Sequence, residues 1–119
     1  FWASWCPACR IELPMLDRLS ARAREMKLSV VAVSEDRAGR DQVQRFVRSL
    51  GIRSLPIYLD PNGYVGHTEP ERTKAPFALY GMPITYLIAS SGRIVGYILG
   101  AVDWTEPAAV ALVDYLRSV

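Results

Sequence analysis

The sequence is poor in metal-binding residues. It holds two cysteines, Cys6 and Cys9, and a single histidine, His67, in a polar stretch that we interpret as surface. A structural zinc site needs about four ligands, so no metal site is predicted. A disulfide between the two cysteines would close a very short loop and remove little entropy from the unfolded chain, which makes it a poor structural cross-link. The pair is better placed for chemistry.

Long apolar runs and a strong charge of one sign are also absent. The densest apolar run in the first half of the chain, 30–33, is far shorter than the roughly 18 residues that a membrane-spanning helix needs. The net charge of +2 is too small to indicate nucleic acid or a membrane surface as partner. With 119 residues, 50% of them hydrophobic, the chain fits one globular domain.

Hydrophobic periodicity predicts three amphipathic helices. The first follows the cysteines, and Pro14 should kink it because proline removes a backbone donor. The second is expected to end at Gly51, a natural C-terminal cap. The predicted helices run from Cys6 through Met26, from Arg40 to Leu50 and from Pro107 to Arg117.

Strands are predicted where short apolar runs lie between turn signals. The valine-rich run 28–34 is apolar on both faces, which is typical of a covered parallel strand. Residues 90–93 are a hairpin signal, and we expect 64–80 to be a loop with one or two helical turns. The predicted strands are 28–34, an edge strand at 56–60, 84–89 and 94–99.

The order of these elements predicts an α/β fold. Strand–helix alternation gives parallel strands, and the hairpin adds two antiparallel ones, so a mixed central sheet should carry helices on both faces in three layers. This is the thioredoxin layout. Because Phe1-Trp2-Ala3 reads as the last part of a buried strand, we expect residues 1–119 to form one thioredoxin-like domain that lacks its N-terminal strand or strands. Any upstream signal or anchor cannot be read from this chain.

The pair Cys6-Pro7-Ala8-Cys9 lies where a buried strand meets a helix. Free N–H groups and the helix dipole at that junction favour a thiolate, and Pro7 fits the first helical turn. Cys6 is therefore expected to be an exposed nucleophile of low pKa, and Cys9 its shielded partner. Cys6 would attack a substrate disulfide, and Cys9 would then resolve the mixed disulfide. Haem attachment would need histidine where Arg10 stands, and an inert disulfide remains an alternative.

Two motifs carry a family resemblance. The segment from Phe1 to Arg10, with Glu12 and Pro14, closely resembles the active-site segment of TlpA-like (TlpA/ResA-type) thioredoxin-fold thiol–disulfide oxidoreductases. The segment 81–85, followed by a strand and a turn at Gly92, resembles the second signature of that family. The resemblance spans nearly the whole chain.

The resemblance implies roles for several residues. Met82-Pro83 would be a cis peptide facing the cysteines, with the backbone of Met82 free to pair with an extended substrate segment. Trp5, Pro7, Met82 and Pro83 would form the surface that meets the substrate.

Glu12 matches an acidic residue that the family places near its cysteines. It lies three positions after Cys9, on a neighbouring part of the helix face. A partly shielded carboxylate there would move protons during thiol–disulfide exchange and raise thiol pKa values. A solvated glutamate, or one paired with a nearby arginine, is an equal alternative.

The function predicted from the resemblance is reduction of protein disulfides outside the cytoplasm, in the periplasm or an equivalent compartment, during cytochrome or cytochrome oxidase maturation. The expected partners are a protein with a disulfide or a CxxC or CxxxC site and an upstream membrane thiol reductase. No cofactor and no nucleic acid are expected, and membrane contact would come only through an anchor upstream of Phe1.

Three other functions deserve comparison. A disulfide-forming oxidant would commonly carry a large helical insertion before Pro83, and this chain has a short polar stretch there. A peroxidase would typically have threonine at the position of Ala3. A Cu(I) metallochaperone module would use Cys6 and Cys9 as soft ligands, although relatives of that kind usually add a histidine beside the proline strand.

Overall fold

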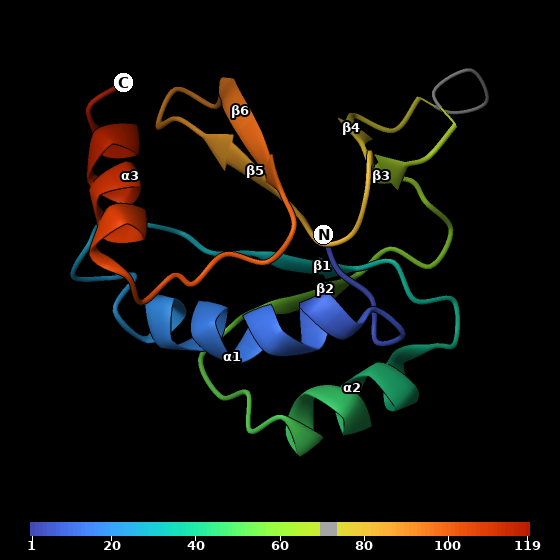
Figure 1. The fold of residues 1–119 in the computed structure, drawn as a ribbon. Helices are drawn as coiled ribbons and strands as arrows, with labels where there is room; N and C mark the ends of the chain where they lie inside the picture. The colour runs from blue at the N-terminus through green and yellow to red at the C-terminus, as the bar shows by residue number, and fades with distance from the viewer. Residues whose placement is uncertain (70–73) are drawn as a thin grey trace.

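The computed structural model describes residues 1–69 and 74–119, which form three helices and six named strands (Figure 1). In chain order the elements are α1 (Pro7–Ala21), β1 (Ala32–Ser34), α2 (Arg40–Ser49), β2 (Ile57–Leu59), β3 (Gly66–His67), β4 (Phe77–Ala78), β5 (Ile84–Ile88), β6 (Ile94–Leu99) and α3 (Pro107–Arg117). Among the described residues, no helix is both long and apolar enough to cross a membrane.

Residues 1–2 join the two main pairs of strands. β1 pairs with β2 in parallel, and β5 pairs with β6 antiparallel. Trp2 forms a parallel bridge with Ser34 at the end of β1. Phe1 and Ile84 exchange two backbone hydrogen bonds of 2.8 and 3.2 Å. The strands therefore follow one another in the order β2, β1, residues 1–2, β5 and β6, which is the predicted mixed sheet.

Two clusters of buried side chains hold the helices against these strands. The first brings Leu13 of α1 and Val43 of α2 to Trp2 and Ala32. The second packs the end of α1 against α3 and the β5–β6 hairpin, as Figure 1 shows on the left of the molecule. Its buried members are Leu19, Met26, Trp104, Ala109 and Val113.

Several predicted boundaries are corrected. α1 runs through Pro14 but ends at Ala21, and the rest of the predicted helix up to Met26 forms turns, with Lys27 at φ 53°. The hydrophobic pattern continued past the helix because Ala23 and Met26 are buried in those turns. The hairpin and the other two helices agree with prediction to within one residue.

The segment 64–80 differs from the expected loop with helical turns. Its described part contains β3 and β4, which pair in parallel, and residues 70–73 lie outside the described part. His67 belongs to β3, where it is half-buried rather than on an open surface loop. The hydroxyl of Tyr86 donates to the carbonyl of Ala78 at 2.5 Å, so β4 is fastened to β5.

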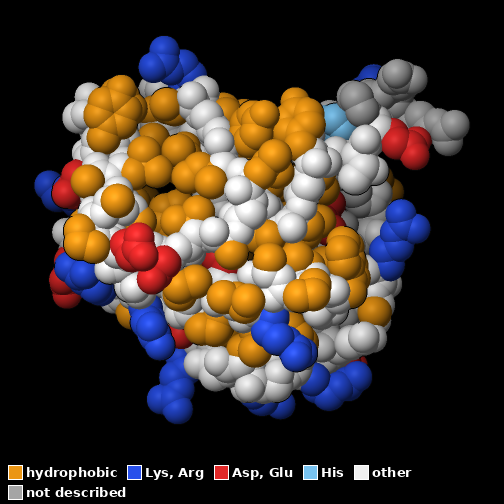
Figure 2. Space-filling model, in the orientation of Figure 1, with side chains coloured by type: hydrophobic (Ala, Val, Ile, Leu, Met, Phe, Trp, Pro, Cys, Tyr) orange, Lys and Arg blue, Asp and Glu red, His pale blue; other side chains and the backbone are white. Residues whose placement is uncertain are grey.

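A groove lies between the run 28–33 and β5. Only 32–34 of the predicted strand 28–34 pair with a neighbour, and Val31 is exposed, contrary to the expectation of a strand covered on both sides. The groove has a volume of about 640 Å³ and a largely apolar lining. Figure 2 shows hydrophobic side chains gathered on this face between α3 and the β5–β6 hairpin. Among the described residues, the run 28–31 has no strand partner on either side, since the pairing with β2 begins only at Ala32, and it therefore forms no strand.

Candidate active site

A buried carboxylate fixes the turn that precedes Cys6. Asp36, two positions after β1, is 5% exposed and accepts hydrogen bonds from the Ser4 nitrogen at 2.9 Å and the Ser4 hydroxyl at 2.5 Å. The Cys6 nitrogen donates to the Ala3 carbonyl at 3.2 Å, which closes the turn. The chain turns here because the strand-like pairing ends at residue 2 and Asp36, rather than a neighbouring strand, accepts the Ser4 N–H.

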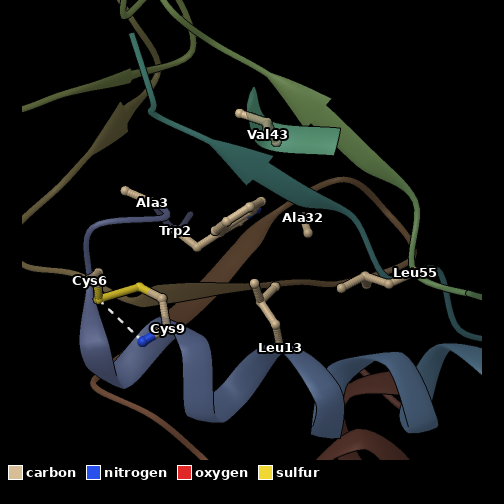
Figure 3. Close-up of a cluster of buried hydrophobic side chains, with 8 residues drawn as sticks. All are labelled: Trp2, Ala3, Cys6, Cys9, Leu13, Ala32, Val43 and Leu55. Atoms are coloured by element: carbon tan, nitrogen blue, oxygen red, sulfur yellow. Dashed lines mark hydrogen bonds between the residues drawn. A yellow bond between two sulfur atoms is a disulfide. The ribbon is translucent and has the colours of Figure 1, made fainter. Parts of the chain in front are cut away.

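Cys6 is the N-cap residue of α1. Its backbone is extended (φ −93°, ψ 112°), and its sulfur accepts the Cys9 N–H at 3.2 Å, drawn as a dashed line in Figure 3. Pro7 occupies the first helical turn, where its missing N–H costs nothing. A thiolate at this position would receive the same N–H and face the positive end of the helix dipole. The predicted helix-start geometry is therefore present.

The two cysteines form a disulfide (Figure 3), with Cα atoms 5.3 Å apart. Cys6 is 4% and Cys9 1% exposed, so the expectation of an exposed Cys6 is wrong for this oxidised form. The reason is the bond itself, since it holds Cys6 Sγ toward Cys9 and the buried cluster with Trp2 and Leu13.

The proline loop lies beside the cysteines. The Met82–Pro83 peptide is cis, as the resemblance implied, and Pro83 is fully buried. Met82 packs against the buried cluster that contains Cys6 and Cys9. The next residue, Ile84, pairs with Phe1, while no backbone hydrogen bond of Met82 is found among the described residues. The structure thus brings the two predicted motifs together and leaves the Met82 backbone open for pairing.

Trp5 and Pro7 form the exposed rim of the site. Trp5 is 68% exposed, and Pro7 is also exposed. An exposed indole directly before Cys6 is able to offer an apolar surface there. Trp2, by contrast, is 3% exposed and belongs to the core, as predicted.

Glu12 is buried beside this site, which excludes the alternative of a solvated glutamate. It is 3% exposed, and its Oε2 accepts hydrogen bonds from the Val102 nitrogen at 2.8 Å and Trp104 Nε1 at 3.2 Å. Burial raises the pKa of the Glu12 carboxyl above its ordinary value, and the two N–H donors oppose that rise. Within the described residues Glu12 forms no ion pair.

A second carboxyl group lies at the end of β1. Burial, followed by the hydrogen bond and charge of Asp60, raises the pKa of Glu35 to about 8. Asp60 is itself buried and accepts N–H bonds from Tyr64, Val65 and Gly66. Protonated Glu35 can therefore donate to ionised Asp60, and the pair fastens the 60–66 loop to β1.

Sequence reasoning missed Asp36, Trp104 and Glu35. Each acts through a contact with a residue distant along the chain, such as Ser4 or Glu12, and no local spacing marks such contacts. A weak signal existed for Asp36, since it follows a buried strand, where polar side chains often bind neighbouring turns. Among the described residues, no group of three or more His, Cys, Asp or Glu side chains could hold a metal ion.

Comparison with known proteins agrees with this geometry. The Redoxin family model matches residues 1–113. Thiol-disulfide oxidoreductase ResA of Oceanobacillus iheyensis is 33% identical over 102 residues, covering 85% of this chain and 47% of that protein. Thiol:disulfide interchange protein CycY of Rhizobium leguminosarum bv. viciae is 34% identical over 95 residues, covering 79% of this chain and 44% of that protein. The chain thus spans about half the length of these curated relatives.

A solved structure shows the same fold. A Chlorobium tepidum protein assigned as thiol:disulfide interchange protein DsbE superimposes with a TM-score of 0.70 at 24% identity, covering 98% of this chain and 72% of that one. The predicted thioredoxin-like α/β fold is therefore confirmed.

Proposed function

We propose a function on the premise that this chain belongs to the Redoxin family, whose model matches residues 1–113. The proposed function of this chain is that of a thiol–disulfide oxidoreductase that reduces protein disulfides through Cys6 and Cys9. The similarity to ResA and CycY agrees with the TlpA-like resemblance. The observation that carries the proposal is the Cys6–Cys9 disulfide at the start of α1, beside the open backbone of Met82.

The reaction starts from the reduced pair. The Cys6 thiolate, stabilised by the Cys9 N–H and the helix start, attacks one sulfur of the substrate disulfide. A Cys6–substrate disulfide forms and the other substrate sulfur leaves as a thiolate. Met82 pairs with the extended substrate segment through its free backbone groups, and Trp5 and Pro7 contact the substrate beside it.

The second step releases the substrate. Cys9 passes its proton to the Glu12 carboxylate, and Cys9 Sγ attacks Cys6 Sγ, so the Cys6–Cys9 bond forms as the Cys6–substrate bond breaks. The leaving substrate thiolate takes up a proton. Two electrons have then passed from the dithiol to the substrate, and the oxidised form seen here is the product. An upstream membrane thiol reductase would restore the dithiol.

The cellular setting follows the resemblance rather than the geometry. We infer an extracytoplasmic location, in the periplasm or an equivalent compartment, from the resemblance to TlpA-like proteins, and because protein disulfides persist outside the cytoplasm. The inferred substrates are proteins of cytochrome or cytochrome oxidase maturation with a disulfide or a CxxC or CxxxC site.

Trapping the mixed disulfide tests the proposal. Cys9→Ser in the full-length protein should accumulate a Cys6–substrate adduct that dithiothreitol releases, because the resolving thiol is gone. Cys6→Ser is the matched control and should trap nothing. If Cys9→Ser also yields no adduct in an extracytoplasmic extract, protein disulfide reduction is wrong for this chain.

Two alternative functions predict different results in copper-binding and redox measurements. A Cu(I) metallochaperone would bind one Cu(I) tightly through Cys6 and Cys9 and would not reduce disulfides. A disulfide-forming oxidant would have a reduction potential near −120 mV, whereas a reductant should lie below about −200 mV. The short segment between Gly51 and Pro83 favours the reductant.

We further propose that an extended segment upstream of Phe1 completes the sheet by filling the groove. Residues 1–2 pair in parallel with β1 and in the antiparallel pattern with β5. A strand continued backward from Phe1 would run between 28–33 and β5, the two walls of the groove. Both walls would then gain a hydrogen-bonded neighbour.

Hydrogen exchange tests this second proposal. By the alternation of the observed pairings, the amides of Val31 and Tyr86 point into the groove. In a protein that includes its natural upstream residues, these two amides should exchange far more slowly than in the 119-residue chain. Equal rates in the two proteins would refute the strand, and the amide of Ala32, already bonded to Pro56, serves as the control.

A further inference from the structure

The carboxyl group of Glu12 is held by a segment 90 to 92 positions further along the chain. The Val102 nitrogen and Trp104 Nε1 both donate to the same oxygen, Oε2, at 2.8 and 3.2 Å. No hydrogen bond to Oε1 occurs within residues 1–69 and 74–119. The two carboxyl oxygens of Glu12 are therefore not equivalent: one is fixed and the other is available.

Trp104 is itself rigidly placed. It is 3% exposed and belongs to the buried cluster in which Leu19 of α1 meets Ala109 and Val113 of α3. Its indole cannot turn away from Glu12 without opening this cluster. The hydrogen bond to Oε2 is thus imposed by the packing of α1 against α3.

We propose that Trp104 is a positioning residue for proton transfer, because its indole N–H anchors Oε2 of Glu12 and leaves Oε1 to exchange the proton of the Cys9 thiol. This rests on the proposed function. Oε1 takes the proton as the Cys9 thiolate forms, and it returns the proton to the substrate thiolate released when the Cys6–Cys9 bond closes. Protons and electrons balance without any further reactant.

The electrostatic surroundings agree with this role. The indole N–H favours the ionised form of Glu12, so it lowers a pKa that burial raises. In the 119-residue chain the groove beside Glu12 is also lined by Lys27, Arg117 and Phe1; the charge on the Phe1 nitrogen favours ionised Glu12 and is absent where a residue precedes Phe1. Asp103, on the same segment as Trp104, is instead turned toward Thr105, whose nitrogen donates to it at 2.9 Å.

Trp104→Phe removes the donor and keeps an aromatic ring in the cluster. The Glu12 carboxyl, followed by carbon-13 NMR, should titrate at higher pH than in the parent protein. Reduction of a protein disulfide at pH 7 should fall roughly 10-fold, as expected for loss of one hydrogen bond to a charged group. The rate of Cys6 alkylation should stay unchanged, because the thiolate at the helix start is not touched. An unchanged Glu12 titration would overturn the proposal.

Two further variants separate positioning from loss of packing. Val113→Ala loosens the same cluster without touching the hydrogen bond, so it should lower the melting temperature and leave the Glu12 titration in place. In a Glu12→Gln background, Trp104→Phe should cause little further loss of rate. A full additional 10-fold loss there would show a merely structural role. If the parent protein reduces no disulfide, the proposed function fails, whereas the Glu12 titration still reports on Trp104.

Discussion

The Asp36 carboxylate accepts hydrogen bonds from both donors of Ser4: the backbone N–H reaches its two oxygens at 2.9 and 3.2 Å, and the hydroxyl donates at 2.5 Å. Asp36 also accepts the hydroxyl of Ser34 at 2.6 Å. The end of β1 is thereby tied to the turn that presents Cys6. The position of Cys6 therefore depends on Asp36, a residue that takes no part in thiol–disulfide exchange.

Asp36→Asn should destabilise the domain and slow catalysis together. Asparagine keeps the size of the side chain, but its neutral amide accepts the Ser4 N–H and O–H more weakly than a carboxylate does. The free energy of unfolding should therefore fall by about 1–3 kcal/mol. Urea unfolding measures the first effect and disulfide reduction the second. The exposed Glu25, which lies outside the helices, supplies the control, since Glu25→Gln should change neither. A fully active and stable Asp36→Asn protein would disprove the dependence on this carboxylate.

Glu35 should make the domain less stable as the pH rises. Its pKa is raised by burial and by Asp60 from an ordinary 4.5 to about 8, so the folded state binds more protons between these values. The free energy of unfolding attributable to Glu35 is therefore fully present below about pH 4.5 and is lost as the pH approaches 8.

Glu35→Gln should remove this component, because glutamine is neutral and can still donate to Asp60. The two proteins are compared by urea unfolding at about pH 5.5 and pH 8.5. Each pH is about one unit or less from the ordinary pKa of 4.5 or the raised pKa of about 8. The exposed Glu25, changed to Gln in parallel, should leave the pH dependence intact. The same pH dependence in Glu35→Gln as in the parent would contradict the assignment.

Trp5→Ala should impair large substrates selectively. The indole is 68% exposed beside Cys6, so its removal costs little stability but takes away an apolar contact for a polypeptide. We expect kcat/KM for a protein disulfide to fall roughly 10-fold, as for an interface residue that contributes more than 1 kcal/mol, while a small aromatic disulfide reacts as before. Tyr64, 77% exposed, offers the matched variant Tyr64→Ala, which should affect neither substrate. Equal losses on both substrates in Trp5→Ala would point to a damaged Cys6 instead.

Local features of the site were predictable from the sequence. The helix start at Cys6, the proline in its first turn and the hairpin 84–99 follow from short-range rules of capping and turn formation. The cis peptide before Pro83 came from the family resemblance alone. The helix start and the hairpin could be predicted because the residues that determine each of them lie within a few positions of one another.

Features that depend on distant partners were not predictable. The run 28–31 has strand composition, yet it forms no strand because no described segment pairs with it on either side. The burial of Glu12 follows from Val102 and Trp104, and no periodicity connects them to α1. The burial of Cys6 in the disulfide form comes with its packing in the cluster that holds Trp2 and Leu13, which lie at other points of the chain.

The most direct measurement mixes reduced protein with a folded substrate protein of known disulfide content and counts thiols on both by alkylation and mass spectrometry. Each Cys6–Cys9 disulfide formed should be matched by one substrate disulfide reduced, and Cys9→Ser should stop at the mixed disulfide. Substrate disulfides that stay intact while Cys6 and Cys9 remain reduced would contradict the account.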